Sequence, residues 1–465
     1  MIRRAAIGLA SVVAVLLGVH LGVRAASKIV PDPVHFSTLP VVTENGIRRA
    51  GRSYVRSVDG ILEVHLVGSP EEIGAAHSVL LHDEMVATEG VVWRLFSEKV
   101  PSYAARALLL DVAGFSYRHV ERSMSDARRR ELAAQALAFS PDPFLAHFDT
   151  YQRFVYLTAL YDISLGYERS PLVGCTTFTF GGAAALGSPI LARNFDFDVD
   201  DIFGQKKAVF FVEETGAIPF ASVAWAGLVG VVSGMNRDGV AVVVHGARAG
   251  PTRTTGETVV HELRRVLSTA RTTDEAIRAL AVTDPLVSHI VIVNDAAGHA
   301  VAVERVPGAA PFVRALGDKA VVTNHLEGPY ASDPKNLRIR QISSTLPRRA
   351  RGDELVRSAT QPVGASDAIT LLRDRQGANG ASLALGDRRA IDALIATHSV
   401  VMETATRRLW VSEAPHVLGK FVAFDLLRLF DGGMPSDVPH PELAADPMLT
   451  DGAYDRYLRA RAAAK

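Results

Sequence analysis

The sequence runs Leu172-Val173-Gly174-Cys175-Thr176-Thr177-Phe178-Thr179-Phe180 and then, after a turn, Gly187-Ser188-Pro189-Ile190-Leu191-Ala192-Arg193-Asn194-Phe195-Asp196-Phe197. Turn signals separate the two segments, which predicts a pair of antiparallel strands. Side chains alternate along a strand, so Arg193 and Phe195 share one face while Asn194 and Asp196 share the other. Arg193 and Asp196 can both approach Cys175 only if one of them lies near the end of its strand.

Cys175 is the only cysteine of the chain, so no intramolecular disulfide and no cysteine-rich metal site can form. Gly174 leaves space around the preceding carbonyl group, which the thiol can then attack. Release of the acyl group by water would expose a new amino terminus at Cys175. An α-amine has a pKa of about 7.7–8.0, which suits a general base for a thiol near 8.5. A lone cysteine is more often a small buried apolar residue, so its surroundings must decide.

Two charged residues of the second strand would complete such a site. Arg193 would stabilise a thiolate and a substrate oxygen, and Asp196 would anchor the new ammonium group. The alternative is an ordinary surface ion pair, which contributes little to stability.

The composition is that of a globular protein. The chain has 465 residues, of which 48% are hydrophobic and 22% charged, and its length predicts roughly two or three domains. Fifty basic residues balance fifty acidic ones, which argues against nucleic acid as a partner. The sequence has no Gly-x-Ser-x-Gly, Walker A, Gly-x-Gly-x-x-Gly or His-Glu-x-x-His motif. The acidic run 196–201 lacks the glycine and distant glutamate of a calcium loop, so we expect no metal and no cofactor.

The N-terminus predicts export. Arg3 and Arg4 precede an apolar stretch from Ala5 to Val23, which is the pattern of a signal peptide or an uncleaved membrane anchor. Residues 1–25 would then lie outside the folded body, and the body would be periplasmic or otherwise extracytoplasmic.

The remaining chain predicts an α+β fold. Residues 26–60 are expected to form a linker and a first strand, and residues 61–174 a strand followed by helices. Ser69 is a candidate N-cap, with Pro70 at the first helical position. From residue 175 short strands dominate, expected at 176–180, 189–197, 206–213, 218–225, 239–245, 288–294, 299–306, 319–323, 398–404 and 407–412. Helices are expected at 256–283, 334–345 and 366–373, which suggests helices layered on antiparallel sheets.

Several motifs together resemble the acyl-CoA:6-aminopenicillanic acid acyltransferase family of N-terminal-nucleophile (Ntn) hydrolases. Penicillin V acylases, bile salt hydrolases and acid ceramidases are relatives. The resemblance covers most of residues 60–415 and rests on Cys-Thr-x-Phe at Cys175, on Gly-x-Pro-x-x-x-Arg-Asn-x-Asp at 187–196, and on these segments: Gly68–Gly74, Trp225–Gly230, Ser233–Val240, Val321–His325, Ser399–Val401 and Leu409–Ser412.

The resemblance implies an αββα four-layer sandwich, made as a precursor and cut between Gly174 and Cys175. Cys175 would be the nucleophile and, through its amine, the base. Arg193 and Asp196 would take the family's arginine and aspartate roles, and Asn324 would donate to the oxyanion. Residues 61–174 would remain bound to residues 175–465 after the cut. The substrate would be a small N-acyl amide.

Two positions depart from the family pattern. Relatives carry another asparagine shortly after the hairpin that contains Asn236, where this chain reads Val243-Val244-His245-Gly246. His245 or a backbone amide are the candidate substitutes. The family's downstream arginine has two candidates, Arg338 and Arg340, which would face apart on a helix.

Three alternatives stay open at this stage. The chain is either an active amidase or acyltransferase, a binding module that has lost its chemistry, or a phospholipase-like esterase. Acyl transfer to water and to an amine are equally compatible with the sequence. The aromatic residues Phe178, Phe180, Phe195 and Phe197 fit either an acyl-chain pocket or ordinary core packing.

Overall fold

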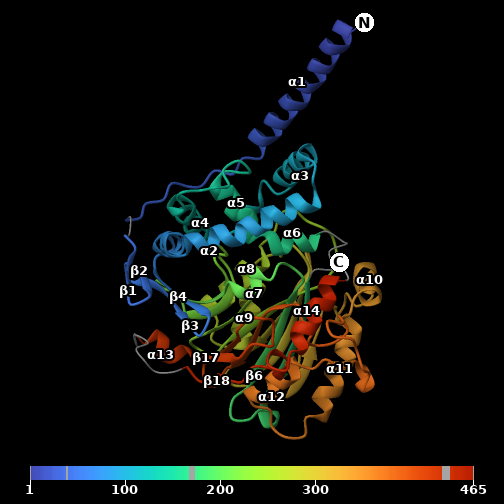
Figure 1. Cartoon of the computed structure of the whole chain (residues 1–465). Helices are drawn as coiled ribbons and strands as arrows, with labels where there is room; N and C mark the ends of the chain where they lie inside the picture. Colours follow the sequence, from blue (N-terminus) through green and yellow to red (C-terminus); the bar gives the residue numbers. More distant parts are fainter. Residues whose placement is uncertain (1, 38–39, 167–172, 432–439, 464–465) are drawn as a thin grey trace.

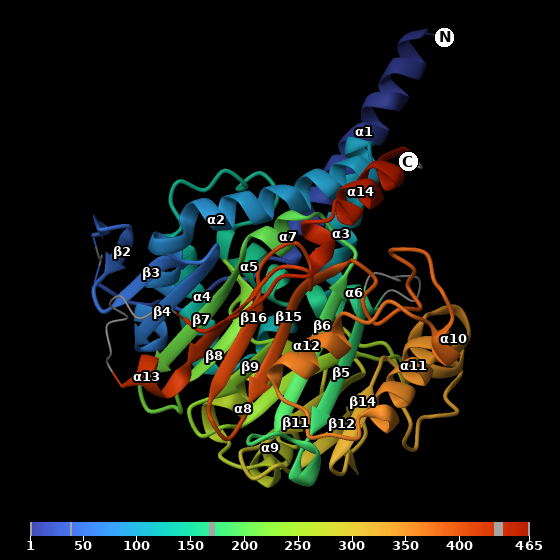
Figure 2. The ribbon, with the colours of Figure 1, turned by 60° about the horizontal axis from the view of Figure 1, so that its bottom comes forward.

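The computed structural model describes residues 2–37, 40–166, 173–431 and 440–463. Within these residues, two β-sheets pack face to face and helices cover both outer faces (Figures 1 and 2). The arrangement confirms the predicted α+β sandwich.

The larger sheet has eleven strands among the described residues. Their spatial order is β1 (Val42–Glu44), β2 (Ile47–Ala50), β3 (Ser53–Val58), β4 (Ile61–Gly68), β7 (Lys207–Glu214), β8 (Phe220–Trp225), β9 (Ser233–Asn236), β10 (Ala241–Gly246), β11 (His289–Asn294), β12 (Ala300–Arg305) and β13 (Phe312–Ala315). Neighbouring strands are antiparallel except for β4 and β7, which pair in parallel.

The smaller sheet has seven strands in the described part of the chain. Their order is β14 (Lys319–Val322), β5 (Val173–Phe180), β6 (Ile190–Phe197), β15 (Ala396–Glu403), β16 (Arg408–Ser412), β17 (Phe421–Asp425) and β18 (Glu442–Leu443). β5 and β6 are the antiparallel pair expected from the sequence, and their register places Cys175 opposite Phe195.

Helices form the two outer layers. The large sheet is covered by α8 (Val259–Thr269) and α9 (Thr273–Leu280) and by the N-terminal helices α2 (Pro70–Lys99), α4 (Asp126–Ala138), α5 (Thr150–Thr158) and α6 (Leu160–Gly166). Helix α3 (Tyr103–Ser116) lies farther out, against the helix at residues 2–26. The small sheet is covered by α10 (Pro334–Ile342), α11 (Thr345–Ser358) and α12 (Ala365–Leu372). Shorter or peripheral helices are α7 (Ile202–Gln205), α13 (Leu426–Phe430) and α14 (Ala453–Ala463).

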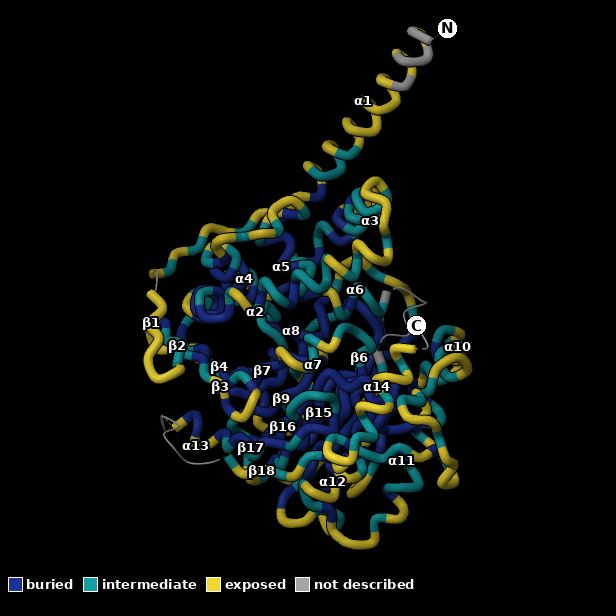
Figure 3. The backbone as a smooth tube through the Cα atoms, in the orientation of Figure 1, coloured by how far each residue is buried: buried dark blue, intermediate teal, exposed yellow. Residues whose placement is uncertain are grey.

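Three apolar clusters fill the interfaces between these four layers. Figure 3 shows that the buried segments of the chain lie mainly in the interior. One cluster joins the N-terminal helices, α8 and α9 to the large sheet, for example through Leu80 and Val242. A second lies between the sheets, where Val243 and Val400 are fully buried. The third joins the small sheet to α11 and α12. Burial of apolar surface at each interface is the main force that holds the layers together.

The N-terminal segment joins the sheet as well as the helical layer. Ser69 caps α2 in a capping box with Glu72, and Pro70 begins the helix, as predicted. The expectation of a linker with one first strand at 26–60 is corrected, because β1, β2 and β3 all lie within 42–58. Pairing of β4 with β7 places these strands at the edge of the large sheet, a long-range contact that local sequence does not reveal.

Helix α1 (Ile2–Ala26) projects away from the body (Figure 1), and the part of it with described side chains is largely exposed (Figure 3). Near its C-terminal end, His20 and Arg24 are hydrogen-bonded to Asp111 of α3, and Arg24 also donates to the His147 carbonyl oxygen. Among the residues that the structure describes, no helix combines the length and the apolar character needed to span a membrane.

Candidate active site

Cys175 lies at the end of β5 where the two sheets and the helical layer meet. Its side chain is fully buried and points into the space between the sheets, on the same face as Thr177, Arg193 and Phe195. Gly174 and Asp196 form the next cross-strand pair and lie on the opposite face, toward α11. The bond between Gly174 and Cys175 therefore has Arg193 on one side of the sheet and Asp196 on the other.

The guanidinium of Arg193 binds the sulfur of Cys175. Its Nη2 lies 3.2 Å from the Cys175 Sγ and also donates to the carbonyl oxygen of Val244. Its Nη1 donates to the carbonyl oxygen of Val232 and to the Ser233 hydroxyl, each at 2.5 Å. The side chain is thus fixed by the large sheet while it presents a positive charge to the thiol.

The thiol is nevertheless protonated in the uncut chain. Burial raises the pKa of Cys175 above its ordinary value, and the attraction of Arg193 for the thiolate only partly opposes this shift. A nucleophile in this place needs a base to remove its proton.

Asn324 contacts the main chain of the same residue. Its Oδ1 accepts from the Cys175 N–H at 2.7 Å and from Arg348 Nη2 at 2.9 Å, while its Nδ2 donates to the carbonyl oxygen of Gly246 at 3.1 Å. Two donors at the oxygen fix the orientation of the amide. Within the described residues this is the one acceptor that Nδ2 contacts, so one of its two hydrogens has no partner there.

Arg348 is the arginine that the structure brings to the site, and the sequence analysis missed it. Its Nη1 donates to the Cys175 carbonyl oxygen and, at 2.8 Å, to the Thr176 hydroxyl. The two candidates from the sequence lie on α10, where Arg338 is exposed and Arg340 is half-buried. Neither is hydrogen-bonded to Cys175 within the described part of the chain, so this expectation is corrected.

Helix α11, which carries Arg348, gives a weak sequence signal. It contains Pro347 and Gly352, and no regular apolar face. Pro347 is tolerated because it occupies the first turn, whose N–H groups have no partner within the helix. The one sequence feature that could have indicated Arg348 is the basic pair Arg348-Arg349 directly after Pro347, in the first turn of the helix.

Asp196 is a buried carboxylate without a full set of partners. Its Oδ1 has no hydrogen-bond partner among the described residues. Burial raises its pKa to about 7, although Arg348 opposes the shift. A Cβ placed on Gly174 would lie 3.5 Å from the Asp196 Oδ2, so the carboxylate is next to the bond that precedes Cys175.

His245 and Asn236 have structural roles in this arrangement. His245 Nε2 is 2.7 Å from the Thr177 hydroxyl and Nδ1 is 3.2 Å from the Thr323 carbonyl oxygen. Both ring nitrogens are therefore engaged, and His245 does not supply the additional oxyanion contact considered for it. Asn236 donates to the carbonyl oxygens of Leu267 and Ala270, and its Oδ1 accepts from the N–H groups of Asp238 and Val240, which fixes the turn between β9 and β10.

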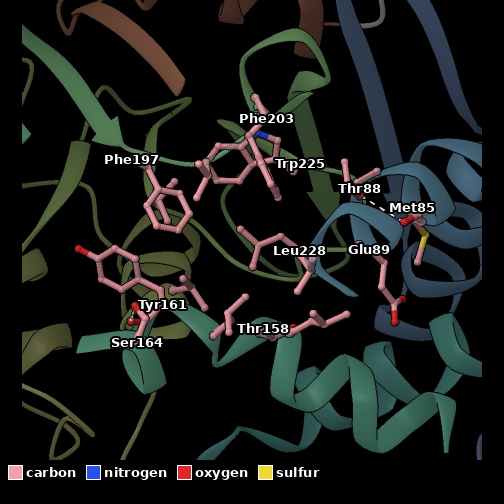
Figure 4. A pocket seen from close by; sticks show the side chains of 18 of the residues that line it. Met85, Thr88, Glu89, Thr158, Tyr161, Ser164, Phe197, Phe203, Trp225 and Leu228 are labelled. Carbon is pink, nitrogen blue, oxygen red and sulfur yellow. Dashed lines mark hydrogen bonds between the residues drawn. The ribbon is translucent and has the colours of Figure 1, made fainter. Parts of the chain in front are cut away.

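An apolar cavity of about 300 Å³ lies beside the site, between the N-terminal helices and the ends of β6 and β8 (Figure 4). Phe195 and Phe197 line it, whereas Phe178 and Phe180 are packed in the core next to α12. Core packing is therefore confirmed for Phe178 and Phe180, and the acyl-chain pocket remains a prediction for Phe195 and Phe197. Its other lining residues include Met85, Glu89, Tyr161, Phe203, Trp225 and Leu228.

No cluster of three or more potential metal ligands occurs among the described residues. The chemistry that these contacts support is that of a thiol, an arginine, a carboxylate and an amide.

Part of the chain matches a known protein family. Residues 185–413 match the family model described as acyl-coenzyme A:6-aminopenicillanic acid acyl-transferase. The match includes Arg193, Asp196, Asn324 and Arg348 and begins ten positions after Cys175. A search of curated proteins finds no match.

Solved structures similar to this chain include three hydrolases. An N-acylethanolamine-hydrolyzing acid amidase ortholog from Caenorhabditis elegans is 18% identical, with a TM-score of 0.38, 50% of this chain covered and 93% of the other. A variant of the conjugated bile acid hydrolase from Clostridium perfringens is 10% identical, with a TM-score of 0.39 and coverage of 58% and 98%. Penicillin V acylase from Agrobacterium tumefaciens is 17% identical, with a TM-score of 0.35 and coverage of 55% and 86%.

Proposed function

We propose that this chain, whose residues 185–413 belong to the acyl-coenzyme A:6-aminopenicillanic acid acyl-transferase family, is a self-processing cysteine amidohydrolase or acyltransferase. One observation carries the proposal. Arg193 donates a hydrogen bond to the sulfur of Cys175, and the main-chain N–H of Cys175 donates to the side chain of Asn324. The same residue thus has one group that stabilises a thiolate and another that holds its nitrogen.

The first reaction is the cut before Cys175. The Cys175 sulfur attacks the Gly174 carbonyl carbon, the peptide C–N bond breaks, and the thiol proton goes to the departing nitrogen. Water then hydrolyses the thioester, which leaves a carboxylate at Gly174 and a free thiol and α-amine at Cys175. The unpartnered oxygen of Asp196 lies next to this bond and supports pairing with the new ammonium group.

The second reaction is acyl transfer from a substrate amide. The α-amine removes the thiol proton, and the thiolate attacks the substrate carbonyl carbon. The C–N bond of the tetrahedral intermediate breaks as the α-ammonium returns its proton to the leaving amine. Water or an acceptor amine then attacks the thioester, and the acyl group leaves the sulfur. Arg193 stabilises the thiolate throughout.

The cavity supports an apolar acyl group as the part of the substrate that is recognised. Its walls are mainly aromatic and aliphatic side chains, including Phe195, the cross-strand partner of Cys175. Helix α2 supplies part of the wall, which supports retention of residues 61–174 after the cut. A volume of about 300 Å³ is at the small end of ligand pockets.

Mass spectrometry and a matched pair of substrates test this proposal. Wild type should contain a chain that starts at Cys175, and Cys175→Ala should remain uncut. Wild type should release p-nitroaniline from decanoyl p-nitroanilide, and Cys175→Ala should not. Hydrolysis of decanoyl p-nitrophenyl ester alone would favour the esterase alternative. An uncut chain without turnover of either substrate would favour the binding module.

We also propose that residues 1–25 direct export, on the basis of their charged and then apolar sequence. Cell fractionation with N-terminal sequencing tests this. A chain found in the cytoplasmic fraction with residues 1–25 still attached would refute it.

A further inference from the structure

We propose that the hydroxyl group of Tyr161 donates a hydrogen bond to the oxyanion of the substrate during acyl transfer to Cys175. This inference rests on the proposed function. It assigns a catalytic residue to the segment that precedes the cut, on α6, whereas Cys175, Arg193 and Asn324 all follow the cut.

The Tyr161 hydroxyl is buried and unused. Its oxygen is inaccessible to solvent and has no hydrogen-bond partner among the described residues. A buried hydroxyl group without a hydrogen-bond partner lowers the stability of the folded chain. A role at a reaction site is one explanation for such a group. The ring itself lines the apolar cavity, where Figure 4 shows it in the same wall as Phe197.

The hydroxyl reaches the site through a gap at Gly246. A Cβ placed on Gly246 would lie 3.4 Å from the Tyr161 oxygen and 2.9 Å from the Leu165 Cδ2. Any larger residue on β10 would therefore crowd α6 at this point. Gly246 is also the residue whose carbonyl oxygen accepts from Asn324 Nδ2, so it lies between the amide of Asn324 and the hydroxyl of Tyr161.

Two further observations place Tyr161 close to Cys175. Its ring stacks on Phe195, the cross-strand partner of Cys175, with ring centroids 6.2 Å apart. Burial, and to a smaller extent the charge of a Cys175 thiolate, raise the pKa of Tyr161 well above its ordinary value of 10. The group is therefore a neutral O–H donor at any working pH, which is the form an oxyanion requires.

In the reaction, the thiolate forms a bond to the substrate carbonyl carbon and the carbonyl π electrons move to the oxygen. The Tyr161 O–H and the free Nδ2 hydrogen of Asn324 then donate to that oxygen without transferring a proton. The electrons return when the C–N bond breaks, and both hydrogen bonds weaken. Donors that strengthen only in the transition state raise kcat and leave KM nearly unchanged.

Tyr161→Phe tests the assignment, with Tyr156→Phe as the matched control. Tyr156 is in the same helical layer, and its hydroxyl donates to the Gly114 carbonyl oxygen and accepts from Gln152. We expect Tyr161→Phe to fold and to be cut normally, because its hydroxyl has no partner in the described chain. Its kcat on decanoyl p-nitroanilide should fall by about 100-fold with KM changed less than about threefold. Tyr156→Phe should retain the wild-type kcat.

A reversible inhibitor separates this inference from the proposed function. Decanal labelled with ¹³C at its carbonyl carbon should form a hemithioacetal with Cys175, visible by NMR and absent in Cys175→Ala. The oxygen of the adduct occupies the oxyanion position, so Tyr161→Phe should bind decanal about tenfold more weakly than wild type. This comparison needs no turnover, and it supports Tyr161 even if no amide is hydrolysed and the amidase proposal fails.

Three results would overturn the role of Tyr161. The first is equal decanal affinity and equal kcat for wild type and Tyr161→Phe. The second is the absence of a decanal adduct in wild type. The third is a Tyr161→Phe chain that melts at the wild-type temperature but stays uncut, which would place the hydroxyl in processing and not in turnover.

Discussion

Arg348 donates a hydrogen bond to the main-chain carbonyl oxygen of Cys175, although 173 positions of sequence separate them. It approaches from α11, on the opposite face of the small sheet from Arg193. Arg348 also contacts Asn324 and stabilises the charged form of Asp196. One side chain therefore holds the strand, the amide and the carboxylate that surround the bond to be cut.

Loss of Arg348 should slow the cut. In Arg348→Met, Asn324 loses one of its two donors and the pKa of Asp196 rises because its main counter-charge is gone. We expect the half-time of processing in a pulse–chase experiment to increase by about tenfold or more. Arg338→Met, an exposed change on the neighbouring α10, should process at the wild-type rate. Equal half-times for the two variants would show that Arg348 is only a packing residue.

Loss of Arg193 should make the thiol harder to ionise. In Arg193→Gln, burial raises the pKa of Cys175 without the opposing positive charge. The reaction of the Cys175 thiol with methyl methanethiolsulfonate should therefore require a higher pH in Arg193→Gln than in wild type, when both chains are compared in the same state of processing. Arg357→Gln, an exposed position near the end of α11, is the control. Superimposable pH profiles for Arg193→Gln and wild type would contradict the contact between Arg193 and the sulfur.

Asp196 should lower the stability of the uncut chain at neutral and alkaline pH. Its folded pKa of about 7 lies above the ordinary value of 3.8, so the folded state binds the proton more tightly. Because of this carboxyl group, the folded chain loses stability as the pH rises from about 4 to about 7. In a Cys175→Ala background, Asp196→Asn should be similar in stability to its parent at pH 4 and more stable by a few kcal/mol at pH 8.

Thermal melts at both pH values measure this difference. Asp83→Asn is the control, because the side chain of Asp83 is 93% exposed. A melting-temperature difference between Asp196→Asn and its parent that does not grow with pH would refute the buried, protonated state of Asp196.

The close packing of α2 on α4 should be sensitive to one methyl group. A Cβ on Gly74 would lie 2.1 Å from the main-chain oxygen of Glu131, so the helices must separate. Gly74→Ala should destabilise the uncut Cys175→Ala chain by about 1–3 kcal/mol. Gly90→Ala in the same helix meets only Phe144 Cζ at 3.7 Å and should be neutral or stabilising by up to about 1 kcal/mol. Equal melting temperatures for both variants would contradict this packing.

Local pattern was sufficient for much of the fold. The pair β5 and β6 and the cap at Ser69 both follow from alternation, turn residues and capping, which act over a few residues. Only one strand was expected where β1–β3 lie, because the place of these strands depends on β4, which pairs with a strand more than 130 positions later. Helix α11 was missed because its proline and glycine hide its periodicity.

The sequence by itself determined the nucleophile candidate, since one cysteine follows one glycine at the start of a strand, and it determined the order of Arg193, Asp196 and Asn324. Only the tertiary structure decided that Arg348, and neither Arg338 nor Arg340, contacts Cys175, and that Tyr161 meets Gly246. Strand spacing and alternation are short-range properties that sequence records. A contact between a helix and a strand depends on how four layers pack, and that is set by the burial of apolar surface over the whole chain.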